Sequence, residues 1–453
     1  MVMVADSVPG LKGFIRPAKL RGTAREMVLR MVIGFIFHRG RMSCLGAAGA
    51  VRSETRHRAQ VSRFLARPRW RAHDMNRVFR EALLEMEAAK GRFLFLVDGT
   101  LCGQQGKKTK NTYSTGNRRR RPKKGRRYGK KKHARKTCHS FTMGLLITPS
   151  GIRIPFQRPY RTEKYCQEKG HVHRTTAESA ADMIRDLPLP EGVEVTVLGD
   201  TAYDAQVVRE ACEDRNYQWI VPCNPERVLA GEKPRPKVRS VLKDWSKKSL
   251  KTIRFVPANG KYANYRRLSP YRVGPKAKSR TYYVHQEKRA VHSVGKVQLV
   301  FSTTKQKLTK ATADDVKILM TNDLRMSVRE VIELYSIRWQ IELFFKELKS
   351  TLGFHQYRFQ EFEAVEGWAE SALTTVLYLE WYRARQLAKR GLSEEKKRWW
   401  RHQRIYGLCQ AIRLGTEQNQ LKYLEDRLET DGGIRRLKRL IRASYPSEYR
   451  AAT

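Results

Sequence analysis

The sequence predicts an α/β fold in which a mixed sheet is interrupted by a β-rich insertion and flanked by helical N- and C-terminal regions. Between residues 92 and 222, apolar strand-like runs alternate with amphipathic helical segments. From 224 to about 318 this alternation gives way to short runs rich in Val, Tyr, Phe and Ile, and from Ser327 onward the pattern is helical. We therefore expect five segments: a helical region at 1–88, the first part of the core at 89–223, the insertion at 224–318, the last part of the core at 319–385 and a basic helical region at 386–453.

Five runs are expected to form the strands of the core. The first, Arg92–Val97, is nearly continuous in apolar residues, as expected of a strand buried on both faces. The other four cover 140–147, 152–156, 193–198 and 218–222, and those of the insertion cover 252–256, 280–284 and 297–302. Helices are expected at Thr176–Asp186 and at Ala205–Arg215, which completes the alternating pattern.

Near the N-terminus, residues 43–51 and 53–65 could be two short helices joined by a turn. Such a pair, rich in arginine, suits a DNA-docking unit. A helical cap whose arginines are simply solvated explains the same residues equally well, so both interpretations stay open.

The charge of the chain predicts a polyanionic partner. Lys and Arg total 92 against 44 acidic residues, which gives a net charge of +48 and a pI near 10.4. The excess positive charges repel one another unless a polyanion such as nucleic acid neutralises them. The apolar run Met27–Phe37 is too short to span a membrane and contains Arg30, so we expect neither a membrane segment nor a signal peptide. The seven cysteines are odd in number and form no C-x-x-C pair, which favours a reducing cytosol over a disulfide framework or a zinc knuckle.

The most extreme charge lies in a loop at 106–137, between the first two expected strands. So many like charges cannot pack without counter-charges, so we expect the loop to contact a DNA or RNA backbone. A solvated loop or a localisation-type basic run is the alternative. The candidate DNA-binding residues of this loop are Arg118, Arg119, Arg120, Arg121, Lys123, Lys124, Arg126 and Arg127.

Two aspartates follow buried strands directly. Asp98 comes after Val97 at the expected end of the first strand, and Asp200 comes two residues after Leu198. An ionised carboxylate at such a place loses hydration unless a cation or hydrogen bonds replace the water. Two of them side by side would repel each other and attract a divalent metal. Asp98 could instead start a turn, and the nearby Asp204 could cap the helix that begins at Ala205.

A third carboxylate lies on a helix expected to run from Tyr335 to Lys349. At 100° per residue from Tyr335, Arg338 falls at about 300°, Glu342 at about 340° and Lys349 at about 320°, all on one edge. Such an edge suits a metal and a phosphate. The plainer alternative is an ordinary ion pair between Glu342 and Lys346 at i,i+4 spacing. Together, Asp98, Asp200 and Glu342 form a set suited to two Mg²⁺ ions around a scissile phosphate.

At these residues a family resemblance becomes specific. The spacing Tyr335-x₂-Arg338-x₃-Glu342-x₆-Lys349 matches the Y-(2)-R-(3)-E-(6)-K signature of the DDE transposases of bacterial insertion sequences, in the cut-and-paste branch. Asp98-Gly-Thr and Gly199-Asp200-x-x-Tyr203-Asp204 also resemble that family's first and second catalytic carboxylates. The resemblance covers about residues 90 to 385.

The resemblance implies an RNase H-like core interrupted by a β-rich insertion. Asp98, Asp200 and Glu342 would be catalytic and ligate two Mg²⁺ ions, which Mn²⁺ could replace, while Tyr335, Arg338 and Lys349 would bind DNA phosphates near the cleaved end. The implied protein is a transposase of the bacterial cytoplasm, associated with the nucleoid, that binds terminal inverted repeats, cleaves DNA and transfers strands to target DNA as a dimer assembled on DNA. A nuclease of the same fold without strand transfer and a non-catalytic DNA-binding descendant remain as alternatives.

Two further features carry less weight. Some relatives hold a flipped base with a tryptophan of the insertion, but the sequence does not assign that role to Trp245. His171 and His173 resemble a metal pair that lacks a third ligand nearby.

Overall fold

The computed structural model describes residues 7–428, except for 21, 39, 51–57, 67–71, 105–107, 116–135, 232–234, 244, 268–278, 309–311 and 313, and it also describes residue 432. The basic residues of the loop, Arg118 to Arg127, lie outside the described residues. The chain forms two compact units: a first unit of Met1–Leu83, Glu347–Ser393 and Gln403–Thr453, and a second unit of Leu84–Lys346 and Glu394–His402.

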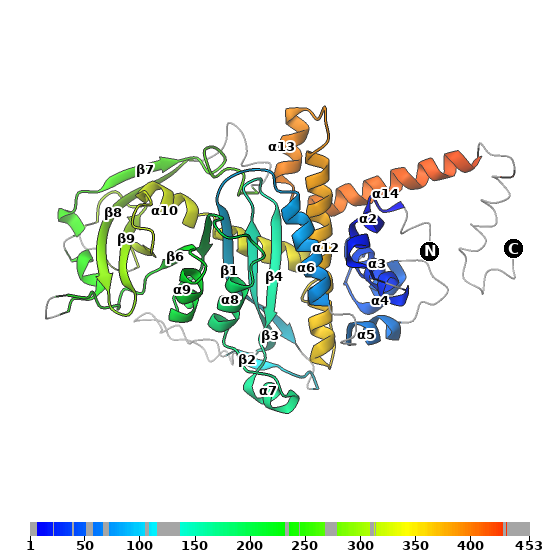
Figure 1. Cartoon of the computed structure of the whole chain (residues 1–453), viewed down its shortest axis with the longest axis horizontal. Helices are drawn as coiled ribbons and strands as arrows, with labels where there is room; N and C mark the ends of the chain where they lie inside the picture. The colour runs from blue at the N-terminus through cyan, green and yellow to red at the C-terminus, as the bar shows by residue number, and fades with distance from the viewer. Residues whose placement is uncertain are drawn as a thin grey trace, which may run out of the picture. The chain divides into compact units, whose positions relative to one another are not determined.

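The second unit contains a ten-stranded mixed sheet in the order β2-β3-β1-β5-β6-β10-β9-β8-β7, with β4 paired to β3 (Figure 1). The predicted α/β class is therefore confirmed. The strands are β1 Phe93–Gln104, β2 Tyr113–Thr115, β3 Lys136–Ile147, β4 Arg153–Pro159, β5 Val195–Leu198, β6 Gln218–Pro222, β7 Lys251–Phe255, β8 Arg280–Val291, β9 Gly295–Thr303 and β10 Lys317–Thr321.

The register of β1 and β5 positions the two aspartates. These strands are parallel, and Leu96 stands opposite Leu198. Asp98 and Asp200 therefore each lie two residues beyond the same registered pair. The expected end of the first strand at Val97 is wrong, because β1 continues to Gln104 in antiparallel pairing with β3. Asp98 is thus held inside a strand, which fixes its backbone more firmly than a loop would.

Three helices follow β4 along the chain: α7 Glu163–Lys169, α8 Thr176–Arg185 and α9 Gln206–Glu213. A capping box starts α8, since the Thr175 side chain accepts a hydrogen bond from the Glu178 amide and the Glu178 carboxylate accepts one from the Thr175 amide. In Figure 1, α8 and α9 lie side by side over the strands of the sheet. The predicted helices at 176–186 and 205–215 are confirmed within a residue or two at each end.

The strands of the insertion continue the same sheet. β10 pairs antiparallel with β6 on one side and with β9 on the other. The Cys223 amide donates to the Ile318 carbonyl at 3.0 Å, so the two ends of the inserted segment meet where β6 pairs with β10. The three strands β7, β8 and β9 extend outward from there (Figure 1).

The helix expected from Tyr335 to Lys349 is broken in two. α10 covers Val328–Tyr335, α11 covers Trp339–Ser350, and a turn at 336–338 separates them. The buried Arg266 explains the break: its guanidinium donates to the carbonyls of Glu333 and Ser336, which a continuous helix would use itself. The angles expected for one straight helix therefore do not apply across Arg338.

The described elements of the first unit are helical: α2 Leu11–Ile15, α3 Gly22–Phe37, α4 Cys44–Ala50, α5 Arg58–Ala66, most of α6 Ala72–Glu85, α12 Phe362–Leu387 and α14 Ile405–Leu428, with a short 3-10 turn at Arg16–Ala18. The long helix α12 is buried along most of its length, so it forms the core of this unit. α13 Glu394–His402 belongs to the second unit. Within the described residues, no helix is both long and apolar enough to cross a membrane.

Candidate active site

Two neighbouring strands and a helix bring three carboxylates together. Asp98 lies in β1, Asp200 follows β5, and Glu342 lies in the first turn of α11. Burial raises the pKa of Asp98, and the negative charges of Asp200 and Glu342 raise it further, which places all three carboxylates within electrostatic reach. The structure thus brings the three predicted site residues to one place.

Backbone amides orient the two aspartates. The Gly99 amide donates to one oxygen of Asp98 at 2.7 Å. Asp200 caps a 3-10 turn, Thr201–Tyr203, by accepting a hydrogen bond from the Ala202 amide at 2.8 Å. Each aspartate uses its Oδ1 in this way, and the Oδ2 of Asp98 accepts a hydrogen bond from the cationic side chain of Arg338.

Arg338 lies between two of the carboxylates. Its guanidinium donates to Asp98 at 3.1 Å and also to Glu342. Burial opposes its charge, but Tyr335, Glu342 and Asp98 together raise its pKa. The alternative ion pair between Glu342 and Lys346 is wrong, because the partner of Glu342 among the described residues is Arg338.

Tyr335 is buried beside this cluster. Burial and the charges of Asp200 and Asp98 raise its pKa to about 12, although Arg338 opposes the shift. The phenol is therefore protonated at neutral pH and able to donate a hydrogen bond. The ammonium of Lys317, at the start of β10, lies 4.4 Å from the centre of the Tyr335 ring.

Lys317 is a site residue that the sequence did not reveal. Its pKa is lowered by partial burial and then by the charge of Arg338, whereas Glu342 raises it. It therefore belongs to the electrostatic environment of the carboxylates. Its only sequence signal is a lysine ahead of a short apolar run, which occurs at many strand starts.

Tyr203 packs between the two strands that carry the aspartates. A Cβ on Gly199 would come within 2.9 Å of the Tyr203 Cβ, and a Cβ on Gly99 would lie 3.6 Å from the Tyr203 hydroxyl. Burial raises the pKa of this phenol, as do Asp98 and Asp200. The glycines beside both aspartates thus make room for one aromatic ring that supports them.

Asp204 holds the turn after Asp200 in place. Its side chain is 3% exposed and binds Arg209 and Arg227, each at 2.7 Å. The expected helix cap by Asp204 is wrong: Ala205 occupies the cap position of α9, and no side chain caps that helix. Two arginines compete successfully for the carboxylate because a buried ion pair needs both of its oxygens satisfied.

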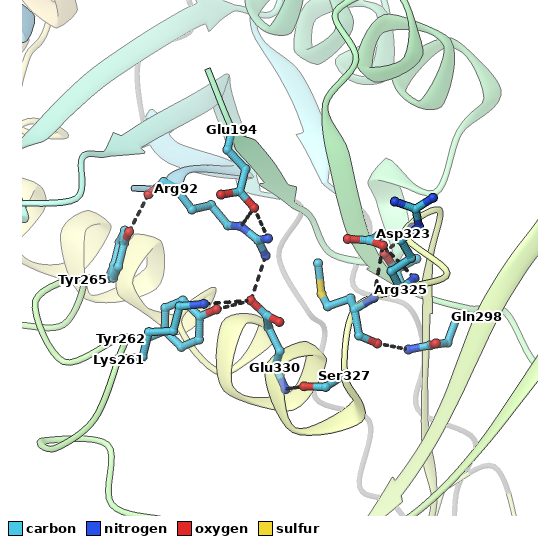
Figure 2. A network of polar contacts seen from close by, with 12 residues as sticks. Arg92, Glu194, Lys261, Tyr262, Tyr265, Gln298, Asp323, Arg325, Ser327 and Glu330 are labelled. Atoms are coloured by element: carbon cyan, nitrogen blue, oxygen red, sulfur yellow. Dashed lines mark hydrogen bonds and ion pairs between the residues drawn. The ribbon is translucent and has the colours of Figure 1, made fainter. Parts of the chain in front are cut away.

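A separate network anchors α10, the helix that ends in Tyr335. Figure 2 shows Arg92, at the start of β1, between Glu194 and Glu330, with nitrogen–oxygen distances of 2.8 Å and 3.3 Å. Glu330 also accepts a hydrogen bond from the Tyr262 hydroxyl and pairs with Lys261 at 3.6 Å. The first turn of α10 is thereby tied to the residue that directly precedes β1, the strand that bears Asp98.

The loop before α10 is fixed as firmly. Ser327 caps the helix by accepting from the Glu330 amide at 3.2 Å, and Asp323 accepts from the amides of Arg325 and Met326. Gln298 of β9 donates to the Met326 carbonyl at 3.0 Å (Figure 2). Hydrogen bonds therefore hold the backbone in place over several residues of the chain before Tyr335.

Other predicted residues lie elsewhere. Lys349 is in the last turn of α11, beyond the boundary after Lys346, and so belongs to the first unit. Trp245 is 2% exposed and packs against Phe301 and His285, which makes it a core residue of the insertion. His173 packs edge-on against Tyr160.

The carboxylates suit a hard divalent cation in chemistry but not yet in arrangement. Mg²⁺ prefers carboxylate oxygens, and burial together with the charges of Asp200 and Glu342 raises the pKa of Asp98, so a bound cation would favour its ionised form. Among the described residues, however, no group of three or more His, Cys, Asp or Glu side chains is arranged to hold a metal ion. Arg338 occupies the position between Asp98 and Glu342, so its guanidinium would have to move before both could bind one ion.

A comparison with protein families gives one match. The family model described as "Transposase DDE domain" matches residues 89–378, which is more than half of the chain and includes Asp98, Asp200 and Glu342. Comparison with curated proteins gives no matching relative.

Proposed function

The chain belongs to the family of proteins with a transposase DDE domain, and from this premise we propose that it is the transposase of a bacterial insertion sequence. In this proposal it binds the terminal inverted repeats of the element, cleaves DNA and joins the freed ends to target DNA. The supporting observation is that Asp98 lies within electrostatic reach of Asp200 and Glu342, with Arg338 paired to Asp98 and Glu342. The family implies an RNase H-like core, and its members are typically catalytic.

Asp98, Asp200 and Glu342 would hold two Mg²⁺ ions, which Mn²⁺ could replace. Bound there, the metal would activate an attacking water or 3′-hydroxyl and stabilise the leaving oxygen. The carboxylates supply the oxygen ligands, and the amide bonds at Asp98 and Asp200 keep their remaining oxygens directed toward the cluster.

Arg338 would change partners when DNA binds. In the described structure its charge compensates Asp98 and Glu342. Metal ions would take over that role and free the guanidinium to bind a DNA phosphate through two parallel hydrogen bonds. Tyr335 would donate its hydroxyl proton to the same phosphate region, and Lys317 and Lys349 would act as point charges.

The DNA partner is supported by the net charge of +48. The basic loop at 106–137 would bind the sugar–phosphate backbone, and two copies would assemble on DNA, because the two ends of an element must be paired before they are joined.

A cleavage assay tests this function. Linear DNA carrying the flanks of the gene is incubated with Mg²⁺ and wild type, Asp98→Asn, Asp200→Asn or Glu342→Gln. We expect each variant to cleave at least about a hundredfold more slowly, because each substitution replaces a negatively charged carboxylate ligand of the metal by a neutral amide. Asp186→Asn is a matched control, because this exposed aspartate pairs with Arg158 outside the cluster. The control variant should cleave DNA like wild type.

Each result has a definite reading. Undiminished cleavage by all three variants would show that the metal site is misassigned. Cleavage by wild type without any joining to a second DNA would identify a nuclease instead of a transposase. DNA binding without cleavage under any metal condition would identify a non-catalytic descendant.

A further inference from the structure

The first unit contains a pocket that the catalytic chemistry does not use. It has a volume of about 840 Å³ and lies between α4, α5 and the segment 356–359. Its lining includes three arginines, one cysteine and two large apolar side chains: Arg41, Arg63, Arg358, Cys44, Leu45 and Phe359. No aspartate or glutamate is among the described residues that line it.

Within the part of the chain that the structure describes, no carboxylate compensates the charges of the three arginines of the pocket. All three are exposed. Arg41 donates to the Gln356 carbonyl at 3.1 Å, Arg63 to the Ala59 carbonyl at 3.2 Å and Arg358 to the Tyr357 carbonyl at 3.1 Å. Among the described residues, none of them forms an ion pair with a carboxylate. Each guanidinium is therefore partly oriented by a main-chain oxygen while further N–H groups remain for an anion.

The pocket shares its positive field with Lys349. Burial lowers the pKa of His355, and the charges of Lys349, Arg358 and Arg41 lower it further. All four residues belong to the first unit. The lysine of the Y-(2)-R-(3)-E-(6)-K signature is thus close to two arginines of the pocket, and together they form one cationic surface.

The remainder of the lining combines apolar and aromatic side chains with the polar residues Ser43, Ser62 and Gln356. Leu45 is 65% exposed, although burying a leucine side chain is energetically favourable. Phe359 and the fully buried Trp368 also line the pocket. Exposed guanidinium groups together with apolar and aromatic side chains in one pocket match a ligand with a phosphate and a flat ring or sugar, as in a nucleotide of a DNA strand.

We propose that this pocket binds one nucleotide of the DNA on which the protein acts. The phosphate contacts Arg41, Arg63 and Arg358, and the sugar and base cover Leu45 and Phe359. The inference rests on the proposed function only in taking DNA as the ligand. It assigns to the first unit a DNA contact that continues from the phosphate held by Lys349, separate from the basic loop at 106–137.

The protein carries its own probe of the pocket. None of the seven cysteines, all of which lie in the described part of the chain, forms a disulfide, and Cys44 is the one that is not buried. A maleimide reagent should therefore label the native chain at Cys44, and Cys44→Ser should remain unlabelled. We expect a saturating 30-base-pair duplex from the gene's flanks to slow labelling at least about fivefold, because a bound nucleotide covers the thiol.

Salt dependence tests the arginines separately. The triple variant Arg41→Gln, Arg63→Gln, Arg358→Gln should reduce the steepness of log binding constant against log salt concentration by about 1, since the pocket neutralises one phosphate and each neutralised phosphate contributes about 0.9. The matched control changes three other exposed arginines of the first unit that do not line the pocket: Arg16→Gln, Arg25→Gln and Arg390→Gln. It removes the same charge and should retain most of the wild-type slope.

The outcomes separate this inference from the proposed function. DNA that binds without slowing Cys44 labelling would overturn the pocket assignment, even if cleavage still required Asp98. Equal slopes for the pocket variant and the control would also overturn it, because only general charge would then matter. Protection of Cys44 by raising the protein concentration without DNA would make the pocket a contact between copies of the chain. Protected Cys44 with cleavage unaffected by Asp98→Asn would instead refute the active site alone.

Discussion

The buried ion triad around Asp204 gives the sharpest prediction about stability. The Asp204 side chain is 3% exposed and that of Arg209 is 7% exposed, whereas Arg227 retains 21%. Asp204→Asn keeps the shape but removes the negative charge, so two guanidinium groups lose their shared counter-ion. Removing one partner from a buried pair costs about 3 to 5 kcal/mol. Because Arg227 is partly solvated, we expect the lower end, about 3 kcal/mol, or a folding equilibrium more than a hundredfold weaker.

Glu226 supplies a matched control for this change. It also binds two cations, Lys237 at 2.7 Å and Arg239 at 2.8 Å, but its side chain is 49% exposed. Water replaces those partners readily, so Glu226→Gln should leave the unfolding midpoint unchanged. The two variants thus differ mainly in the burial of the carboxylate.

Urea titration at pH 7 measures both variants, with hydrogen exchange of the β5 and β6 amides as a local readout. Asp204 acts on catalysis only by holding the turn after Asp200. Asp204→Asn should therefore lower the rate of DNA cleavage while the salt slope of DNA binding stays at the wild-type value. An unfolding midpoint for Asp204→Asn equal to that of Glu226→Gln would refute the reasoning.

Three further predictions concern single charges. Burial and two nearby carboxylates raise the pKa of Asp98, so the folded state loses stability as pH rises through that pKa and the carboxyl ionises. Asp98→Asn should remove this loss of stability in metal-free protein. The variant should therefore be more stable than wild type in urea at pH 7 while failing to cleave DNA. Lys317→Met should lower the salt slope of DNA binding by about 1 and Lys317→Arg should preserve it, so an unchanged slope in the methionine variant would exclude a phosphate contact. Although burial opposes the shift, His285, Lys248 and Arg289 lower the pKa of Glu287 to about 2. The Glu287 carboxylate therefore stabilises the fold above its ordinary pKa, and this stabilisation is lost as pH falls toward 2. Acid titration should weaken wild type more than Glu287→Gln, and parallel curves of stability against pH for the two proteins would contradict this.

The α/β class and most strands of the core could be predicted because burial leaves a direct mark on sequence. The run from Phe93 to Val97 is apolar on both faces, and Thr175 with Glu178 signals the start of α8. The end of β1 could not be predicted in the same way. Beyond Asp98 the strand alternates between buried and exposed residues, and its pairing with β3 depends on a segment some forty residues away.

The candidate site was accessible as a set of residues but not as an arrangement. The positions of Asp98, Asp200 and Glu342 follow from their strand and helix contexts. The break before Arg338 depends on the side chain of Arg266, about seventy residues earlier, and the pairing of Arg338 with Asp98 depends on the fold itself. Lys317 has no local signal, because its contact with the Tyr335 ring joins the start of a strand to the end of a helix.

The hydrogen bond between Cys223 and Ile318 has an evolutionary consequence. A segment whose two ends already touch can be lengthened, shortened or exchanged with little loop-closure cost, since the chain on either side keeps its position. β6 and β10 would still pair, and the path from β10 to Tyr335 would start from the same place. Selection could therefore remodel the intervening strands while leaving Asp98, Asp200 and Glu342 in register. The intervening strands are accordingly where homologues should differ most in length.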